Sequence, residues 1–84
     1  MKESILVIDD EEDIRELIRY NLSKDGFLVT CVATGEEGLS QISTVKPDLI
    51  ILDLMLPGID GLEVCRRLKT DAAFKSIPVV MVSA

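Results

Sequence analysis

Short apolar runs alternate with longer segments of helical periodicity along this chain, and this alternation constrains its fold more than any other feature. The runs are Ile5–Ile8, Leu49–Leu52 and Val79–Val82. Each is far shorter than the roughly 20 residues that span a bilayer. Short aliphatic runs are typical of strands covered on both faces, as in a parallel sheet flanked by helices. The sequence therefore predicts an α/β fold, a three-layer sandwich without a membrane segment.

Four strands and three intervening helices are expected. The strands are predicted at Ile5–Ile8, Phe27–Val32, Leu49–Leu52 and Val79–Ser83. A first helix is indicated by apolar residues spaced i, i+3, i+4 and i+8, and Gly26 favours its end. Those apolar residues are Ile14, Leu17, Ile18 and Leu22.

The other two helices have recognisable starts. Thr34 and Glu37 have the spacing of a capping box, and Asp60 with Glu63 suggests a second cap. We expect the apolar residues of these helices to face the core. They are Leu39, Ile42 and Val45 in the second helix, and Leu62, Cys65 and Leu68 in the third.

Composition excludes several classes of function. The chain has 84 residues, enough for one domain, and a formal net charge of −6. An acidic chain without a basic stripe is poorly suited to direct contact with nucleic acid. Cys31 and Cys65 are too few for a zinc site in a chain without histidine, so buried reduced thiols are expected. Acidic residues 9–13 directly follow the first apolar run, unlike a signal peptide, and a cytoplasmic location is expected.

Three aspartates follow directly on predicted strands. Asp9 and Asp10 come after the first run, and Asp53 comes after the third. Parallel strands end at one sheet edge, where α/β folds bind their ligands. In the flavodoxin-like order 2-1-3-4 the first and third strands are neighbours, about 4.8 Å apart. Carboxylates that close repel one another unless protons or a cation intervene, and Mg²⁺ prefers such oxygen ligands.

Each of these residues also has a simpler interpretation. An Asp pair after a strand commonly caps the next helix, and Asp53 alone is commonly a turn residue. Ser83, at the end of the fourth run, would be unremarkable by itself. The coincidence of all of them at matching strand ends favours a shared site.

Three segments resemble one known family. ILVIDDEEDIRELI is similar to the opening of bacterial response-regulator receiver domains, and KPDLIILDLMLPGIDGLEVCRRLK is similar to their central block. IPVVMVSA resembles their fourth strand. Together these segments extend over essentially the whole chain, and the second is most typical of transcription factors of the OmpR/PhoB type.

The resemblance implies a role for each matching residue. Asp53 would accept a phosphoryl group from a sensor histidine kinase and also ligate Mg²⁺. Asp10 would bind Mg²⁺ directly, Asp9 mainly through water, and Met55 through its backbone carbonyl. Ser83 would be the switch hydroxyl that moves toward the phosphorylated aspartate. The resemblance thus implies a phosphorylation-dependent switch rather than an enzyme, as the regulatory domain of a DNA-binding transcription regulator.

The chain departs from the family's pattern at its end. The family places a lysine after a fifth strand, and this sequence stops before that strand. We therefore interpret residues 1–84 as the N-terminal portion of a receiver domain, without the fifth strand and the last two helices. An unpaired fourth strand predicts self-association.

Two alternatives remain at this stage. A haloacid-dehalogenase-like phosphatase also uses an aspartate at a strand end with Mg²⁺, but it needs a second aspartate where this chain has Met55. The segment could also keep the fold without being competent for switching.

Overall fold

Strands and helices alternate strictly in the computed structural model, which describes residues 2–82. The strands are β1 (Ser4–Ile8), β2 (Leu28–Val32), β3 (Leu49–Asp53) and β4 (Val79–Val82). The helices are α1 (Glu12–Lys24), α2 (Gly35–Val45) and α3 (Gly61–Lys69). Every predicted element with described residues is present, with boundaries shifted by a residue or so.

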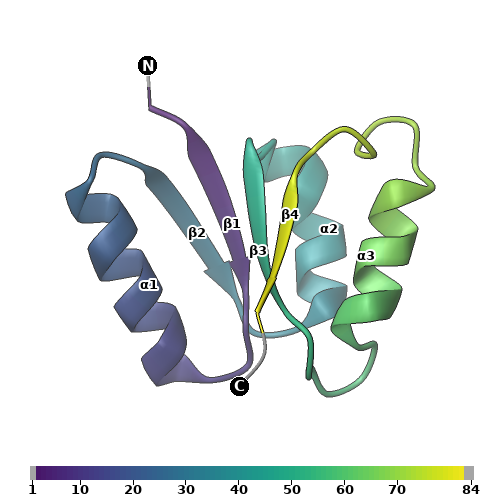
Figure 1. Ribbon diagram of the computed structural model, residues 1–84, viewed down its shortest axis with the longest axis horizontal. Coiled ribbons are helices and arrows are strands. Elements are labelled where there is room, and N and C mark those ends of the chain that lie inside the picture. Colours follow the sequence, from purple (N-terminus) through teal and green to yellow (C-terminus); the bar gives the residue numbers. More distant parts are fainter. Residues whose placement is uncertain (1, 83–84) are drawn as a thin grey trace.

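The four strands form one parallel sheet in the order β2-β1-β3-β4. This is the expected order, with β1 and β3 paired at the centre from Ile5↔Leu49 to Ile8↔Leu52. Helix α1 covers one face, and α2 and α3 cover the other, so the fold is a three-layer sandwich (Figure 1). All four strands run toward the edge of the sheet at the bottom of that view.

The main core lies between the sheet and the helix pair α2–α3. Side chains alternate between the faces of a strand, so Leu6, Ile8, Ile50 and Leu52 share this face. They are essentially inaccessible and pack with residues of α2 and α3. Burying each such side chain contributes about 1.5–3 kcal/mol. The helix residues of this cluster are Ile42, Val64 and Leu68, with Leu39, Val45 and Cys65 packed partly buried against it.

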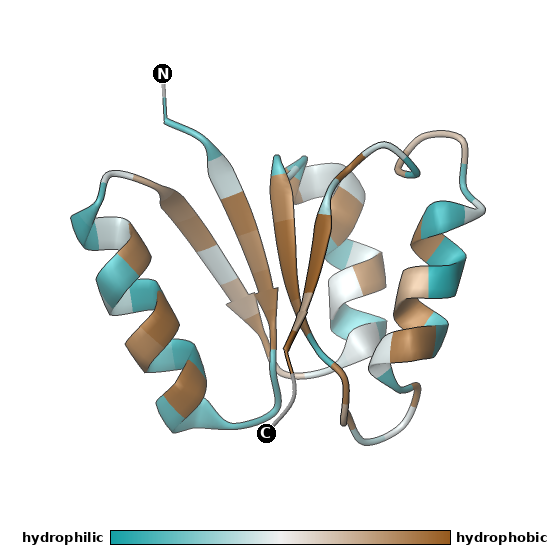
Figure 2. Ribbon diagram, in the orientation of Figure 1, coloured by the Kyte–Doolittle hydropathy of each residue, from teal (hydrophilic) through white to brown (hydrophobic). Residues whose placement is uncertain are grey.

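The opposite face is covered less completely. No residue of α1 is buried, and Ile14 and Leu17 are 36% and 59% exposed. Figure 2 shows the apolar bands of α1 beside its hydrophilic ones. On the same face of the sheet, Val80 of β4 is 47% exposed. The apolar periodicity of α1 therefore predicts the helix correctly, although much of its apolar surface is not enclosed by residues 2–82.

The prediction for one residue of α3 is wrong. Leu62 was expected in the core, but it is 64% exposed, and Val64 is buried in its place. An α-helix turns about 100° per residue, so Leu62 lies on the far side of the helix from Val64. Val64 and Leu68, four residues apart, share the buried face.

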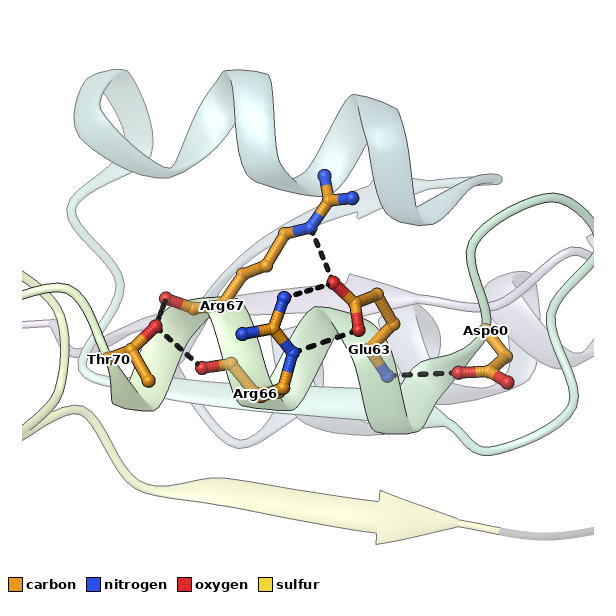
Figure 3. A network of polar contacts seen from close by, with 5 residues as sticks. All are labelled: Asp60, Glu63, Arg66, Arg67 and Thr70. Atoms are coloured by element: carbon orange, nitrogen blue, oxygen red, sulfur yellow. Dashed lines mark hydrogen bonds and ion pairs between the residues drawn. The ribbon is translucent and has the colours of Figure 1, made fainter.

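Both predicted caps are observed. Thr34 Oγ1 accepts a hydrogen bond of 3.1 Å from the backbone N–H of Glu37, and Asp60 Oδ1 accepts one of 2.9 Å from Glu63. On the exposed side of α3, Glu63 pairs with Arg66 at 2.6 Å and with Arg67 at 2.9 Å (Figure 3). The hydrogen bonds from these two guanidinium groups lower the pKa of Glu63 to about 2. Arg66 and Arg67 thus lie on a solvated face of α3 and pair with Glu63 of the same helix, whereas Lys69 donates to the carbonyls of Lys75 and Ile77.

Three strand ends differ from the predictions. β1 begins at Ser4 rather than Ile5, β2 begins at Leu28 rather than Phe27, and β3 includes Asp53 as its last residue. β4 is described to Val82, and Ser83 lies outside the described residues. Among residues 2–82, no helix combines the length and apolar character needed to cross a bilayer.

Candidate functional site

Three carboxylates meet where β1 and β3 end. One oxygen from each of Asp9, Asp10 and Asp53 lies within 4.8 Å of the others. Asp9 and Asp53 are only 5% and 7% exposed, whereas Asp10 is exposed. The pairing of β1 with β3 brings them together, which is the arrangement that the strand order predicts. Their roles as ligands or acceptor stay predictions.

Asp9 is held by hydrogen bonds of its backbone and its side chain. Its N–H donates to the carbonyl of Val32 at 3.2 Å, and its carbonyl accepts from Arg15 Nη1 at 2.9 Å. Its Oδ1 accepts from the N–H of Glu11 at 2.9 Å. Glu11 itself is the N-cap of α1 and makes no side-chain capping bond. Asp9 therefore shapes the β1–α1 loop rather than capping the helix, contrary to the simpler interpretation of the Asp pair.

The environment of Asp9 favours its neutral form. Burial raises the pKa of this carboxyl, and the hydrogen bond from Glu11 opposes that effect. The charges of Asp53 and Asp10 raise the pKa further, and Arg15 lowers it. The net direction is upward, as expected for a carboxylate taken out of water beside two like charges.

Asp53 is oriented by the segment that follows it. Its Oδ1 accepts a 3.0 Å hydrogen bond from the N–H of Met55. The next residue, Leu54, donates its N–H to the carbonyl of Val82 at 2.8 Å, which continues the pairing with β4. The carboxylate of Asp53 is thus fixed within a short, hydrogen-bonded strand end.

Gly61, the first residue of α3, packs directly on the backbone of Asp53. A Cβ added to Gly61 would overlap the carbonyl oxygen of Asp53 and lie 2.9 Å from the Cα of Leu54. The Gly61 N–H donates to the carbonyl of Leu54 at 3.2 Å. Sequence reasoning missed this residue. The available signal was a glycine directly after the predicted cap residue Asp60, because a glycine in a helical pattern often marks a close backbone approach.

The loop between β3 and α3 forms an open groove beside the carboxylates. Met55 is 71% exposed, and its side chain lines the groove with Asp10, Pro57 and Leu62. Gly58 has φ of 72°, in the left-handed region that favours glycine. Pro57 and Gly58 lie at a bend of this loop.

The donor set fits a hard divalent cation. Three carboxylates converge, and no lysine or arginine forms an ion pair with any of them within residues 2–82. Carboxylate oxygens suit Mg²⁺, and the chain has no histidine to favour a softer metal. Burial is the main cause of the raised pKa of Asp9, and the negative charges of Asp53 and Asp10 add to it.

Comparison with known proteins gives one consistent result. The family model described as "Response regulator receiver domain" matches residues 5–84. The chain is 46% identical to the alkaline phosphatase synthesis transcriptional regulatory protein PhoP of Bacillus subtilis, over 84 residues. It is 42% identical to the phosphate regulon transcriptional regulatory protein PhoB of Rhizobium meliloti. It covers 34% and 37% of these relatives, so it spans about a third of their length.

Solved structures agree in fold. The N-terminal domain of a response regulator receiver protein from Methanoculleus marisnigri superimposes with a TM-score of 0.91 at 38% identity. That match covers 94% of this chain and 64% of the other. A sensor protein from Polaromonas superimposes with a TM-score of 0.95 at 31% identity, covering 100% of this chain and 67% of the other.

Proposed function

Because this chain belongs to the response regulator receiver family, we propose that it is a phosphorylation-dependent signalling switch with Asp53 as phosphoryl acceptor. The observation that carries this proposal is the convergence of Asp9, Asp10 and Asp53 within 4.8 Å at the end of the central strands. The proposed phosphoryl donor is a sensor histidine kinase.

Four residues are proposed to hold Mg²⁺: Asp10 and Asp53 through their carboxylates, Asp9 mainly through water, and Met55 through its carbonyl. When bound, the cation would offset negative charge on the transferring phosphoryl group. The chain itself supplies orientation, since the N–H of Met55 fixes one oxygen of Asp53. An oxygen of Asp53 attacks phosphorus, the bond from phosphorus to the imidazole nitrogen of the donor breaks, and the electron pair stays with the departing imidazole.

The response to phosphorylation is assigned to Ser83. Its hydroxyl is proposed to reach the phosphoryl group after transfer. Replacing Ser83 with alanine should leave acceptance at Asp53 largely intact and weaken the response. This division of roles rests on the family resemblance, because Ser83 lies outside the described residues.

The wider setting follows from the relatives. Their names describe transcriptional regulators, so we propose that this segment regulates a DNA-binding effector. Its net charge of −6 makes direct contact of the segment with DNA unfavourable. The cytoplasmic location and the self-association expected from the sequence stay predictions.

Phosphorylation of the protein tests the proposal directly. Acetyl phosphate or phosphoramidate with Mg²⁺ should modify Asp53 alone, and borohydride trapping with mass spectrometry locates the adduct. The matched variants are Asp53→Asn, which should take up no phosphoryl group, and Asp10→Asn, which should take it up far more slowly. An adduct at Asp9 or Asp10 would contradict these roles. A protein that binds Mg²⁺ but forms no adduct would favour the alternative of a fold without switching.

The phosphatase alternative has a separate test. A hydrolase of that kind needs an acid–base group two residues after the nucleophile, and the thioether of Met55 carries no proton to transfer. The protein should therefore not turn over p-nitrophenyl phosphate catalytically. Sustained multiple turnover, lost in Asp53→Asn, would favour the enzyme.

A further inference from the structure

Arg15 reaches from α1 to the loop that carries two of the three carboxylates. Its Nη1 donates a 2.9 Å hydrogen bond to the backbone carbonyl of Asp9. The side chain is half-buried, and within residues 2–82 it forms no ion pair. Its backbone carbonyl also accepts a 3.8 Å contact from the Sγ of Cys31 on β2. Arg15 thus connects the sheet, the helix and the loop.

The bonded carbonyl has a particular position in the site. It belongs to the peptide that joins Asp9 to Asp10, and a peptide unit is planar. Fixing that oxygen therefore fixes where the Cα of Asp10 lies. Asp9 has two further anchors, to Val32 and Glu11. The exposed carboxylate of Asp10 depends more on the orientation of the Asp9–Asp10 peptide.

We propose that Arg15 is a positioning residue, which holds the Asp9–Asp10 peptide so that the Asp10 carboxylate faces Asp53. The inference deepens the proposed function and rests on it, since it concerns the same cation site. The charge of Arg15 and its hydrogen bond predict opposite effects on Mg²⁺ affinity when the side chain is removed. A positive charge beside a cation site weakens binding of the cation, so loss of charge alone would tighten it. Loss of the hydrogen bond to the peptide would weaken it.

The decisive variant is Arg15→Met, which removes both charge and donor but keeps much of the apolar stem. We expect its affinity for Mg²⁺ to fall about 10-fold, the lower end of the range for groups that hold metal ligands in place. Arg15→Lys keeps the charge on a shorter side chain, and its affinity for Mg²⁺ should lie between those of the wild type and Arg15→Met. The matched control is Arg19→Met, one turn along the same helix, because Arg19 pairs with Glu16 at 2.6 Å. The affinity of Arg19→Met for Mg²⁺ should be unchanged or slightly higher.

A second measurement does not depend on metal. The Glu11 amide is bonded to Asp9 Oδ1 within this loop. In metal-free protein its hydrogen exchange should accelerate in Arg15→Met and not in Arg19→Met. Unchanged exchange would overturn the proposal, and so would Mg²⁺ binding in Arg15→Met at wild-type strength or tighter. Arg15→Lys provides the same comparison if Arg15→Met does not fold. A wild-type protein that binds no Mg²⁺ would instead contradict the proposed function, and the exchange of Glu11 would still decide the role of Arg15.

Discussion

The negative charge of Asp9 destabilises the folded protein, because folding buries this carboxyl. A carboxyl whose folded-state pKa is raised is ionised more easily in the unfolded chain. Stability is therefore lost as pH rises from the ordinary value of 3.8 through the raised pKa of Asp9. At a pH above the raised pKa of Asp9, the metal-free protein bears the whole of this cost.

We predict that Asp9→Asn raises the thermal midpoint of the metal-free protein at pH 7 by several degrees. The amide removes the buried charge and can still accept the hydrogen bond from Glu11. Asp9→Ala is the control, since it removes the charge and the acceptor together and should gain less. Thermal unfolding at pH 7, with and without Mg²⁺, tests this. A lower midpoint for Asp9→Asn without metal would show that the charge of Asp9 is already compensated.

Gly61 leaves no room for a larger side chain, because the atoms nearest to it are backbone atoms of Asp53 and Leu54. We predict that Gly61→Ala destabilises the protein by about 1–3 kcal/mol, the usual cost of forcing extra volume into a packed site. The control is Gly38→Ala, whose Cβ would meet the flexible end of the Ile8 side chain, so that a rotamer change can relieve the overlap. Urea unfolding of both variants measures the difference. Equal costs would show that the start of α3 can move freely from Asp53.

At the scale of elements, local sequence signals determine where the helices begin. They do not determine which face of each helix is buried. Thr34 and Asp60 predict two helix starts correctly because a cap involves only a few neighbouring residues. The prediction for Leu62 was wrong because residues spaced three apart, such as Leu62, Cys65 and Leu68, do not stay on one face of a helix. Packing against the sheet determines that Val64 and Leu68 are the buried residues. The contact of Gly61 with Asp53 joins α3 to β3, and that of Arg15 with Asp9 joins α1 to the loop before it. Sequence periodicity predicts neither contact, because it describes single elements only. The aspartate cluster was predictable because each member directly ends a strand or follows one.

The exposed face of α3 should show a distinct pH dependence. Glu63 has its pKa lowered to about 2 by Arg66 and Arg67. A lowered carboxyl pKa contributes stability above the ordinary value of 4.5, which is lost as pH falls from 4.5 to about 2. Glu63→Gln should therefore flatten the stability profile within that window. Urea unfolding across the window measures it, and salt should reduce the effect because Arg66 and Arg67 are exposed to solvent. An unchanged profile would mean that the pairs of Glu63 contribute nothing in solution.

At the scale of the whole molecule, β4 has only one paired side within residues 2–82. It pairs with β3, and Val80 and Met81 are 47% and 36% exposed. An apolar strand edge favours pairing with another chain. We predict that the 84-residue protein self-associates and that Val80→Lys shifts it toward the monomer. Sedimentation velocity over a range of concentrations tests this, with Leu28→Lys on the opposite edge strand as control. A monodisperse wild-type monomer would refute the prediction.

The central pairing of β1 with β3 also determines when the acidic pocket can exist. Ser4 and Asp48, which are hydrogen-bonded at the start of these strands, are 44 positions apart in the chain. Closing so long a loop carries an entropy cost before any contact offsets it, and such non-local pairing is slow. In the unfolded chain Asp53 is distant from Asp9 and Asp10, and the repulsion between them is screened by solvent. Their mutual repulsion thus arises as the chain folds, at the step that joins β1 to β3, and a divalent cation can relieve it only from that step onward.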